Sequence, residues 1–411
     1  MTNQRVDGII CFGGDRWGDV KRPSQLMLQL SRRVPVVYAE PYLSATSVLK
    51  NWRTAFSPHS SARLVRALSG TTDQAAPDLH LTSTMVAIPP NRLSHVVTAK
   101  ALEAMSARYH RAAARRAYRV AEQLGISSPV LWVSYPLPLT EPIGGGGPVV
   151  YDCMDRWSDF PDALADENYR RVIVDAEQRL LERADLVFCS AAGLFESKSK
   201  TAKGEVMLLR NGADVAHFLP GNRVAPQDIA SLPRPILGYI GAMADWVDFE
   251  LLRSVAVARP EWSLVFIGPL FDGKSSGDAD SLRLIASLPN VHLLGSRPYD
   301  ELPPYLEAFD VAVIPFKLNG LTEDTDPIKV YEYLAAGVPV VSTPLREVQR
   351  LPEVRLASGP EEFVRECEAA LSERSDADLV ARRTEVARCN SWETRAEAAW
   401  QSIVGIADSS C

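Results

Sequence analysis

The sequence contains no long apolar run. Nowhere in its 411 residues does a stretch approach the roughly 20 apolar residues that a helix needs to cross a bilayer. The first seven residues, MTNQRVD, also lack the apolar core of a secretion signal. The composition, 46% hydrophobic and 23% charged, is that of a globular protein and excludes a disordered one. We expect a cytoplasmic protein, and its length predicts two domains.

The sequence also lacks the patterns of metal, disulfide and nucleic-acid sites. Its six cysteines are scattered singly, with no Cys-x-x-Cys pair and no histidine at metal-ligand spacing. Free thiols and no zinc are therefore expected. The net charge is −7, and no motif interleaves aromatic with basic residues, so a nucleic-acid partner is not expected.

The net charge hides an asymmetry between the two ends of the chain. Residues 1–150 hold 17 Lys and Arg against 9 Asp and Glu, a net +8, which leaves −15 for the remainder. Helical spacing places four arginines of this part on one face, and we add Arg22 to the same group. The four are Arg108, Arg111, Arg115 and Arg119. This face suits an anionic acceptor or anionic lipid headgroups, and the alternative is an ordinary solvated helix face.

Short apolar, β-branched runs alternate with helical stretches along the whole chain. This alternation predicts an α/β fold with parallel sheets covered by helices on both faces, in two doubly wound domains. The join is expected near residues 211–235, where Asn-Gly, Pro-Gly and further prolines cluster. The predicted strands are 8–12, 34–38, 130–134, 149–152 and 186–190, then 236–240, 263–267, 291–294, 311–315 and 339–342.

The clearest local pattern is the segment 325–341, which reads as a helix start, a helix and the next strand. Pro327 suits the first helical position, because its missing N–H would be unpaired there in any case. Thr325 or Asp326 can cap the helix, and Gly337 can end it.

Two charged side chains of this helix suggest a nucleotide site. Lys329 lies in the first turn, where the helix dipole is positive and an anion such as phosphate is favoured. Glu332, one turn later, can accept two hydrogen bonds from the hydroxyls of a ribose. In the alternative reading, Lys329 points into solvent or pairs with Asp324 or Asp326.

Motifs at strand ends rank above others, because ligands of doubly wound sheets bind beyond the carboxyl ends of the strands. Gly13 and Gly14 follow the first strand and permit close approach to a ligand, or else form a tight turn. Their spacing to Gly18 is not that of a dinucleotide fingerprint. Asp152 ends another strand, and Asp155 follows it either as a site residue or as a helix cap.

The second domain offers three further candidates. Gly241 follows the strand 236–240 and lets a ligand approach the backbone, in a loop that continues to Asp245. Arg297 follows the strand 291–294 and can reach a diphosphate, or is a surface arginine.

With these motifs in order, the chain resembles the retaining glycosyltransferases of the GT-B fold, family 4 or group 1. The likeness is strongest to bacterial teichuronic acid and capsular polysaccharide enzymes. It rests on segments from the Gly13-Gly14 loop to 329–337. The fold implied is two Rossmann-like domains facing across a cleft: an acceptor domain (1–215), a sugar-nucleotide domain (216–390), and a C-terminal helix (391–411) packing back on the first.

The resemblance also implies roles for individual residues. Glu332 would hold the ribose of the donor, and the 325–330 amides with Lys329 would face its phosphates. Catalytic roles fall on Asp152, Asp324 and Glu332. Donor contacts are implied for Gly13, Gly14, Gly241, Asp245, Arg297, Thr325, Lys329, Val330 and Glu332.

The chain departs from the family pattern at three places. Asp324 replaces the first glutamate of the usual pair, which shortens that contact by a methylene. The loop around Asp245 lacks the usual arginine and lysine, so the phosphate cation must come from Arg297, Lys329 or the first domain. Asp152 stands where many relatives have a histidine, and an ionised carboxylate cannot donate a hydrogen bond.

The activity implied is transfer of a sugar from a nucleotide sugar to an acceptor hydroxyl, with retention and without a metal. The acceptor would be a carbohydrate or lipid-linked molecule, with peripheral association with the inner face of the membrane. A sugar-nucleotide epimerase on the same scaffold and a non-catalytic sugar-nucleotide-binding partner remain as alternatives.

Overall fold

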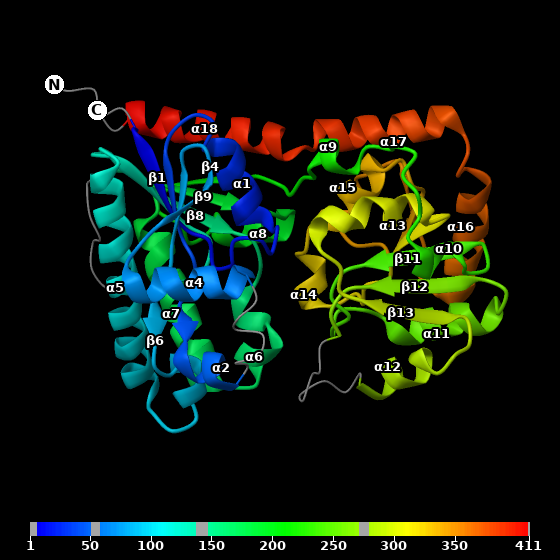
Figure 1. The fold of residues 1–411 in the computed structure, drawn as a ribbon, viewed down its shortest axis with the longest axis horizontal. Coiled ribbons are helices and arrows are strands. Elements are labelled where there is room, and N and C mark those ends of the chain that lie inside the picture. The colour runs from blue at the N-terminus through cyan, green and yellow to red at the C-terminus, as the bar shows by residue number, and fades with distance from the viewer. Residues whose placement is uncertain (1–5, 51–57, 137–146, 271–278, 410–411) are drawn as a thin grey trace. The chain divides into compact units, whose positions relative to one another are not determined.

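The chain folds into two compact units in the computed structural model, which describes residues 6–50, 58–136, 147–270 and 279–409. Unit 1 comprises Met1–Arg210 and Arg395–Cys411, and unit 2 comprises Asn211–Thr394 (Figure 1). The first junction therefore falls five residues before the predicted one, and the second falls four residues after it.

Unit 1 is built on one large sheet with the strand order β10-β9-β8-β7-β1-β2-β5-β4. All neighbours are parallel except β4, which pairs with β5 in antiparallel orientation. The central strands are buried on both faces, which is why they read as continuous apolar runs. The strands are β1 (Gly8–Phe12), β2 (Val36–Ala39), β4 (Asp73–Ala76), β5 (Leu79–Thr82), β7 (Pro129–Val133), β8 (Val149–Cys153), β9 (Leu186–Cys189) and β10 (Glu205–Leu208).

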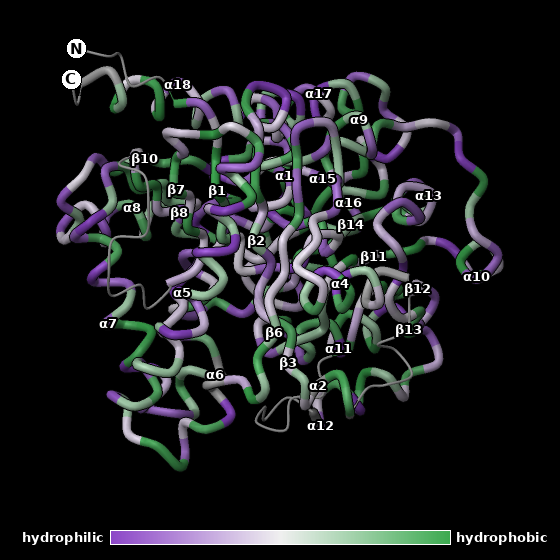
Figure 2. The backbone as a smooth tube through the Cα atoms, turned by 60° about the vertical axis from the view of Figure 1, so that its left-hand side comes forward, coloured by the Kyte–Doolittle hydropathy of each residue, from purple (hydrophilic) through white to green (hydrophobic). Residues whose placement is uncertain are grey.

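Helices and a small second sheet complete unit 1. Hydrophobic and hydrophilic residues alternate along the helices, which Figure 2 shows as green and purple. The two-stranded sheet pairs β3 (Leu43–Ser44) with β6 (Met85–Val86). The helices are α1 (Arg22–Leu30), α2 (Ala45–Lys50), α4 (Pro58–Ser69), η1 (Pro90–Leu93), α5 (Ala99–Gln123), η2 (Trp157–Asp159), α6 (Pro161–Leu164), α7 (Glu167–Arg183) and α8 (Ala192–Lys198).

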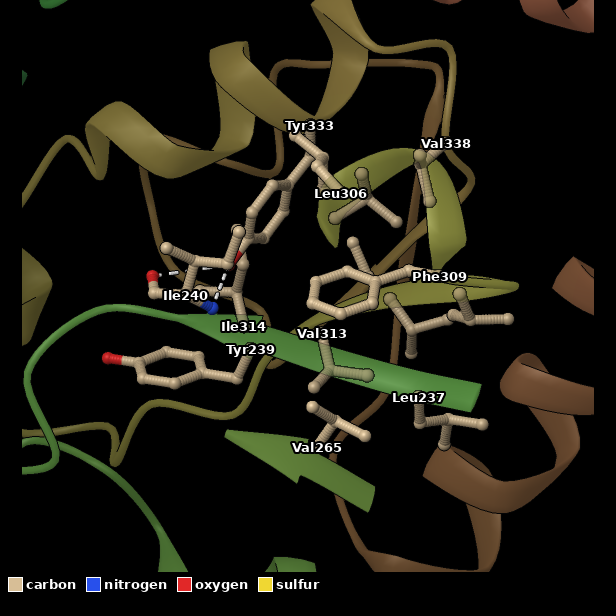
Figure 3. Packing of buried hydrophobic residues seen from close by; sticks show 14 of the residues in the cluster. Leu237, Tyr239, Ile240, Val265, Leu306, Phe309, Val313, Ile314, Tyr333 and Val338 are labelled. Atoms are coloured by element: carbon tan, nitrogen blue, oxygen red, sulfur yellow. Dashed lines mark hydrogen bonds between the residues drawn. The ribbon is translucent and has the colours of Figure 1, made fainter. Parts of the chain in front are cut away.

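Unit 2 is built on a parallel sheet with the order β13-β12-β11-β14-β15-β16. Figure 3 shows part of its core, where Phe309 lies beside Leu306 and Val313. The strands are β11 (Ile236–Ile240), β12 (Ser263–Ile267), β13 (Val291–Gly295), β14 (Val311–Ile314), β15 (Val340–Ser342) and β16 (Val354–Leu356). The helices are α9 (Val215–Phe218), α10 (Gln227–Ala230), α11 (Phe249–Ala258), α12 (Ala279–Ala286), η3 (Tyr299–Glu301), α13 (Leu302–Ala308), α14 (Gly320–Glu323), α15 (Ile328–Ala335), α16 (Pro360–Ser372) and α17 (Ala377–Cys389).

The last helix, α18 (Trp392–Ser409), starts in unit 2 and continues in unit 1. Trp392 is buried, and its backbone N–H donates to the Ala213 carbonyl at 3.1 Å. Further along, Glu397 forms an ion pair with Arg33 of unit 1. Among the helices that the structure describes, none combines the length and the apolar character needed to cross a membrane.

The strand orders place a topological switch point in each sheet. In unit 1 the chain runs outward from β1 through β2 and then returns to β7 on the other side of β1. In unit 2 it runs from β11 through β12 and β13 and returns to β14 beside β11. Since ligands of doubly wound sheets bind where the strand order reverses, the loops after these strands are the first places to look for a site.

Candidate functional site

Helix α15 begins at the switch point of unit 2 and is fastened to β11. The Tyr333 hydroxyl accepts the Ile240 N–H at 2.8 Å (Figure 3), at the last residue of the strand. Directly after it, Gly241 has a φ of +152°, where side chains are strained. A Cβ there would lie 3.0 Å from the Tyr239 hydroxyl and 3.1 Å from Cε of Lys329. The strand end therefore passes close beneath the Lys329 side chain.

The Lys329 ammonium lies over two aromatic rings. Its Nζ lies 4.7 Å from the ring centre of Phe316 and 5.2 Å from that of Tyr239, both within cation–π range. No hydrogen bond or ion pair joins the ammonium to another described residue, so the alternative pairing with Asp324 or Asp326 is not observed. Burial lowers the pKa of Lys329 to about 8, against the opposing charge of Glu332. This cation is available to an anionic ligand.

The start of α15 differs from the predicted cap. Pro327 is the N-cap instead of the first helical residue, and no side chain caps the helix. Asp326 is 3% exposed and accepts the Asn211 N–H and the Tyr331 hydroxyl, each at 2.7 Å. The Thr325 hydroxyl donates instead to the Leu321 carbonyl at 2.9 Å. Asp326 thus braces the segment and leaves the positive end of the helix open. The predicted end is confirmed, because Gly337 has a φ of +70° one residue beyond the C-cap.

Glu332 follows one turn later with its carboxylate unpaired among the described residues. Burial raises its pKa to about 7, with Lys329 opposing the shift and Asp214 adding to it. Tyr299 is close enough to Glu332 for the two to interact electrostatically. Burial raises the pKa of the Tyr299 phenol, and the charges of Glu332 and Asp214 raise it further. That hydroxyl is buried without a hydrogen-bond partner in the described chain, and the ring stacks on His217 at 4.4 Å. The Glu332 carboxylate and the Tyr299 hydroxyl both lack hydrogen-bond partners in the described chain, which favours a ligand that supplies hydroxyls.

The other candidates of unit 2 are Val330, Asp324 and Asp245. Val330 has its side chain in the core, and its N–H already donates to the Pro327 carbonyl at 3.1 Å. Asp324 is 4% exposed and ends α14, while Asp245 is partly exposed in the loop after β11.

Arg297 is a correction to the expected phosphate cation. Its guanidinium donates to Asp228 at 2.7 Å and to the Tyr305 hydroxyl at 2.9 Å, and it lies over the Tyr305 ring. Its charge is therefore already compensated. Of the two cations proposed in this unit, Lys329 is the one that remains available.

In unit 1 the two glycines after β1 are needed for packing. A Cβ on Gly13 would lie 1.9 Å from the Tyr38 hydroxyl, and Gly14 has a φ of +77°. A Cβ on Gly14 would also approach Cβ of Tyr135 at 3.1 Å, so the loops after β1 and β7 touch at the switch point. Neither position has room for a side chain, and the hydrogen-bonded turn of this loop lies further on, where the Asp19 N–H donates to the Arg16 carbonyl at 3.2 Å.

Asp152 and Arg22 are a second correction, because they pair with each other in the core. Asp152 is fully buried and Arg22 is 2% exposed. The Arg22 guanidinium donates to one Asp152 oxygen at 2.7 and 2.9 Å, and the other oxygen accepts the Ser134 hydroxyl at 3.4 Å. Asp152 therefore has no free face for a sugar, and Arg22 does not belong to an exposed basic surface.

Helix α5 carries the predicted basic face in reduced form. Arg108, Arg115 and Arg119 are exposed, whereas Arg111 is partly buried. Within the described residues no group of three or more His, Cys, Asp or Glu side chains is placed to hold a metal ion.

Known proteins match both the sequence and this architecture. A profile described as "Glycosyl transferases group 1" matches residues 234–373, within unit 2. TuaH of Bacillus subtilis strain 168, named as a teichuronic acid biosynthesis glycosyltransferase, is 30% identical over 276 residues, covering 64% of this chain and 68% of TuaH. The chain belongs to the group 1 glycosyltransferases. It is thus a transferase, as the resemblance in its motifs predicts.

Solved structures place this glycosyltransferase in the GT-B fold. Sucrose-phosphate synthase from Thermosynechococcus elongatus superimposes with a TM-score of 0.68 at 16% identity, covering 97% of this chain and 99% of that one. Trehalose-6-phosphate synthase OtsA of E. coli, in a structure with UDP-2-fluoro glucose, gives 0.67 at 10% identity, with coverage of 97% and 99%. HepE of Anabaena, in complex with UDP and glucose, gives 0.59 at 13% identity, with coverage of 97% and 100%.

The sequence did not indicate the aromatic rings around Lys329, and it left the role of Asp155 open. Tyr239 and Phe316 flank Lys329, although each reads only as an apolar strand or loop residue. Asp155, which the sequence left open between a site residue and a helix cap, caps nothing and is partly exposed; Arg156 is the N-cap of η2. The strand order could have favoured Phe316, because it follows β14 at the switch point.

Proposed function

We propose that unit 2 binds a nucleoside diphosphate sugar as the glycosyl donor. The uncompensated charge of Lys329, beside the uncapped start of α15, is the observation that carries this proposal. A diphosphate there would receive an ammonium and helix amides, and it would gain from the low polarity of the flanking rings. Glu332, one turn further, would accept the ribose hydroxyls.

The chemistry proposed is transfer with retention. The bond between the anomeric carbon and the departing phosphate oxygen breaks, and a bond from the acceptor oxygen to that carbon forms on the same face. The acceptor proton passes to the departing phosphate. Lys329 and the amides of α15 would stabilise the charge on the leaving diphosphate, so no metal ion is required for that purpose.

The titles of the structural relatives support UDP as the first probe, because OtsA is described with UDP-2-fluoro glucose and HepE with UDP and glucose. Calorimetric titration with UDP, with and without EDTA, tests binding and metal independence together. Release of nucleoside diphosphate from a panel of nucleotide sugars then tests turnover. Binding of no nucleoside diphosphate in the panel would contradict the proposal, and loss of binding in EDTA would contradict metal independence.

We also propose that unit 1 receives the acceptor, a saccharide attached to a lipid at an anionic membrane surface. The name of TuaH supports a cell-surface polysaccharide as the product. Arg116 donates to the Arg66 carbonyl at 2.6 Å and to the Thr71 carbonyl at 2.8 Å, which ties α5 to the end of α4. There Val65 and Leu68 are 58% and 68% exposed.

We call Val65 and Leu68 of α4, together with Arg108, Arg115 and Arg119 of α5, the α4–α5 face. Its exposed cations suit anionic headgroups, and its exposed aliphatic side chains suit the boundary of the acyl chains. Association with the inner face of the membrane would follow.

A further inference from the structure

A second group of polar side chains lies at the switch point of unit 1. The loops after β1, β7 and β8 meet there, and they contribute Asp15, Tyr135 and Asp155 in turn. Gly14 and Tyr135 are in contact distance, as the 3.1 Å approach to an added Cβ indicates. None of these three side chains was assigned a role by the motifs of the family.

Asp155 is the available carboxylate at this edge. It is partly exposed, and its side chain has no hydrogen bond or ion pair among the described residues. The two cations whose charges act on it are already engaged: Lys21 pairs with Asp15 at 2.7 Å, and Arg22 pairs with Asp152 at 2.7 Å. Burial and the charge of Asp15 raise the pKa of Asp155 to about 7, with Lys21 and Arg22 opposing.

An aromatic cluster includes Trp157, which follows this carboxylate by two residues. The Trp157 ring lies edge-on to Tyr135 at 4.8 Å and is stacked with Phe160 at 5.3 Å, and all three residues are partly exposed. A hydrogen bond of 2.9 Å joins the hydroxyls of Tyr135 and Tyr169. The Trp157 indole N–H is buried without a partner in the described chain, so an unmet donor lies two residues from an unmet acceptor.

We propose that this Asp155–Trp157 site binds a neutral saccharide residue at the accepting end of the acceptor. Aromatic rings pack on the apolar C–H faces of sugars, and a carboxylate accepts hydrogen bonds from their hydroxyls. A sugar that bears a carboxylate is disfavoured, because it would face Asp155 and Asp15 while Lys21 and Arg22 are already paired. The inference rests on the proposed function, and it adds the class of sugar that this enzyme extends.

Saccharide binding to the full-length protein tests the inference directly. The probes are the methyl β-glycosides of glucose, galactose and N-acetylglucosamine, with methyl β-glucuronide as the charged match of the glucoside. Saturation-transfer NMR titrations give the dissociation constants. We expect at least one neutral glycoside to bind and the uronide to bind at least about tenfold more weakly than its neutral match, as expected for a like-charge contact.

Two variants locate the site. Asp155→Asn should weaken the binding of the neutral glycoside about tenfold or more, because a hydrogen bond to a charged acceptor is lost. Trp157→Leu should weaken it as well. Glu122→Gln, which removes one exposed charge from α5, is the matched control and should leave binding unchanged.

UDP titration of the same samples separates the two proposals. Unchanged UDP binding in Asp155→Asn, together with weakened glycoside binding, supports the inference. Binding of UDP without binding of any neutral glycoside overturns it, as does equal binding of the glucuronide or an unaltered Asp155→Asn. Failure to bind any nucleoside diphosphate counts against the donor proposal alone.

Discussion

Lys329 shows how a residue can be locally unfavourable and still be retained. A positive charge in the first turn of a helix opposes the dipole, and partial burial adds to the cost. The rings of Phe316 and Tyr239 offset part of this, yet no carboxylate neutralises the ammonium within the described chain. This absence of a carboxylate partner is why we propose a diphosphate as the ligand of Lys329.

Replacing this lysine separates its charge from its packing. Lys329→Met keeps the contacts with the rings and removes the ammonium, so UDP affinity should fall about 10- to 100-fold, as for loss of a charge-assisted hydrogen bond. Lys329→Arg keeps the charge and should retain more of the affinity. Calorimetric titration measures both. The melting temperature of Lys329→Met should not fall, because the change removes a partly buried charge; equal UDP affinity in wild type and Lys329→Met would reject the phosphate assignment.

The pH dependence of UDP binding follows from the same side chain. With a pKa of about 8 in the free protein, Lys329 is charged below pH 8 and loses its proton as the pH rises above it. A bound diphosphate favours the charged form, so affinity should decrease above pH 8, by up to about tenfold per pH unit. The phosphates of UDP are already ionised there. Lys329→Arg should show a flat profile from pH 7.5 to 9.5, because arginine stays charged; a parallel decrease in both proteins would assign the titration to another group.

Glu332 can be tested against the hydroxyls that it is proposed to bind. Glu332→Ala should abolish measurable transfer without unfolding the chain, because the carboxylate has no partner among the described residues and is proposed to hold the ribose. In wild type, 2′,3′-dideoxy-UDP should bind about tenfold or more weakly than UDP, since a charged acceptor loses its donors. In Glu332→Ala the two nucleotides should bind alike. A remaining preference for UDP in that variant would place the ribose elsewhere.

At the scale of elements, the pair Arg22–Asp152 joins α1 to the end of β8. Both side chains are buried, so each compensates the charge of the other in a setting where a lone charge is costly. The resemblance had placed Asp152 beside the reacting sugar. The geometry gives it a bracing role, and a loss of activity on mutation would then reflect a disturbed loop.

Urea denaturation distinguishes these roles. Asp152→Ala leaves the Arg22 guanidinium uncompensated and should lower the free energy of unfolding of unit 1 by about 3–5 kcal/mol. The double change Arg22→Met with Asp152→Leu removes both charges and should recover most of that loss. UDP binding by the folded fraction should persist in both, because the nucleotide is assigned to unit 2. An unaltered unfolding midpoint in Asp152→Ala would contradict the bracing role and leave Asp152 as a candidate ligand contact.

The sequence predicts the regular elements better than their connections. The runs 8–12, 236–240 and 263–267 match β1, β11 and β12, because strands buried on both faces are continuous and apolar. Strands β4 and β5 were not predicted, since an antiparallel edge pair has no such run. The Arg22–Asp152 pair joins positions 130 residues apart, which no local pattern encodes.

The same limit applies to the candidate site. Lys329 and Glu332 could be proposed from sequence because helical spacing places them on successive turns, near a recognisable helix start. The rings around Lys329 come from β11 and from the segment after β14. The partner of Arg297, Asp228, lies in α10, so both arrangements required the fold. Thr325 or Asp326 was expected to cap α15, and Asp326 instead accepts a hydrogen bond from Asn211, because the cap prediction considers only neighbours in sequence.

At the scale of the whole molecule, charge is divided between the parts that would meet different partners. Residues 1–150 carry a net +8 and the remainder −15. An acidic protein as a whole would be repelled by an anionic membrane, so any attraction must come from a local surface. The α4–α5 face is a part of unit 1 where exposed cations and exposed aliphatic side chains occur together.

Liposome sedimentation tests that face. The full-length protein should bind vesicles that contain phosphatidylserine at low salt, and binding should weaken as salt is raised because the Debye length shortens. The triple variant Arg108→Gln, Arg115→Gln, Arg119→Gln should lose about 3 kcal/mol, roughly 100-fold in the partition constant, at about 1 kcal/mol per cation. Its matched control changes the exposed Arg283, Arg365 and Arg388 of unit 2 to Gln and loses the same net charge. If net charge alone governs adsorption, the two triple variants lose binding equally, and the α4–α5 face is then not a membrane surface.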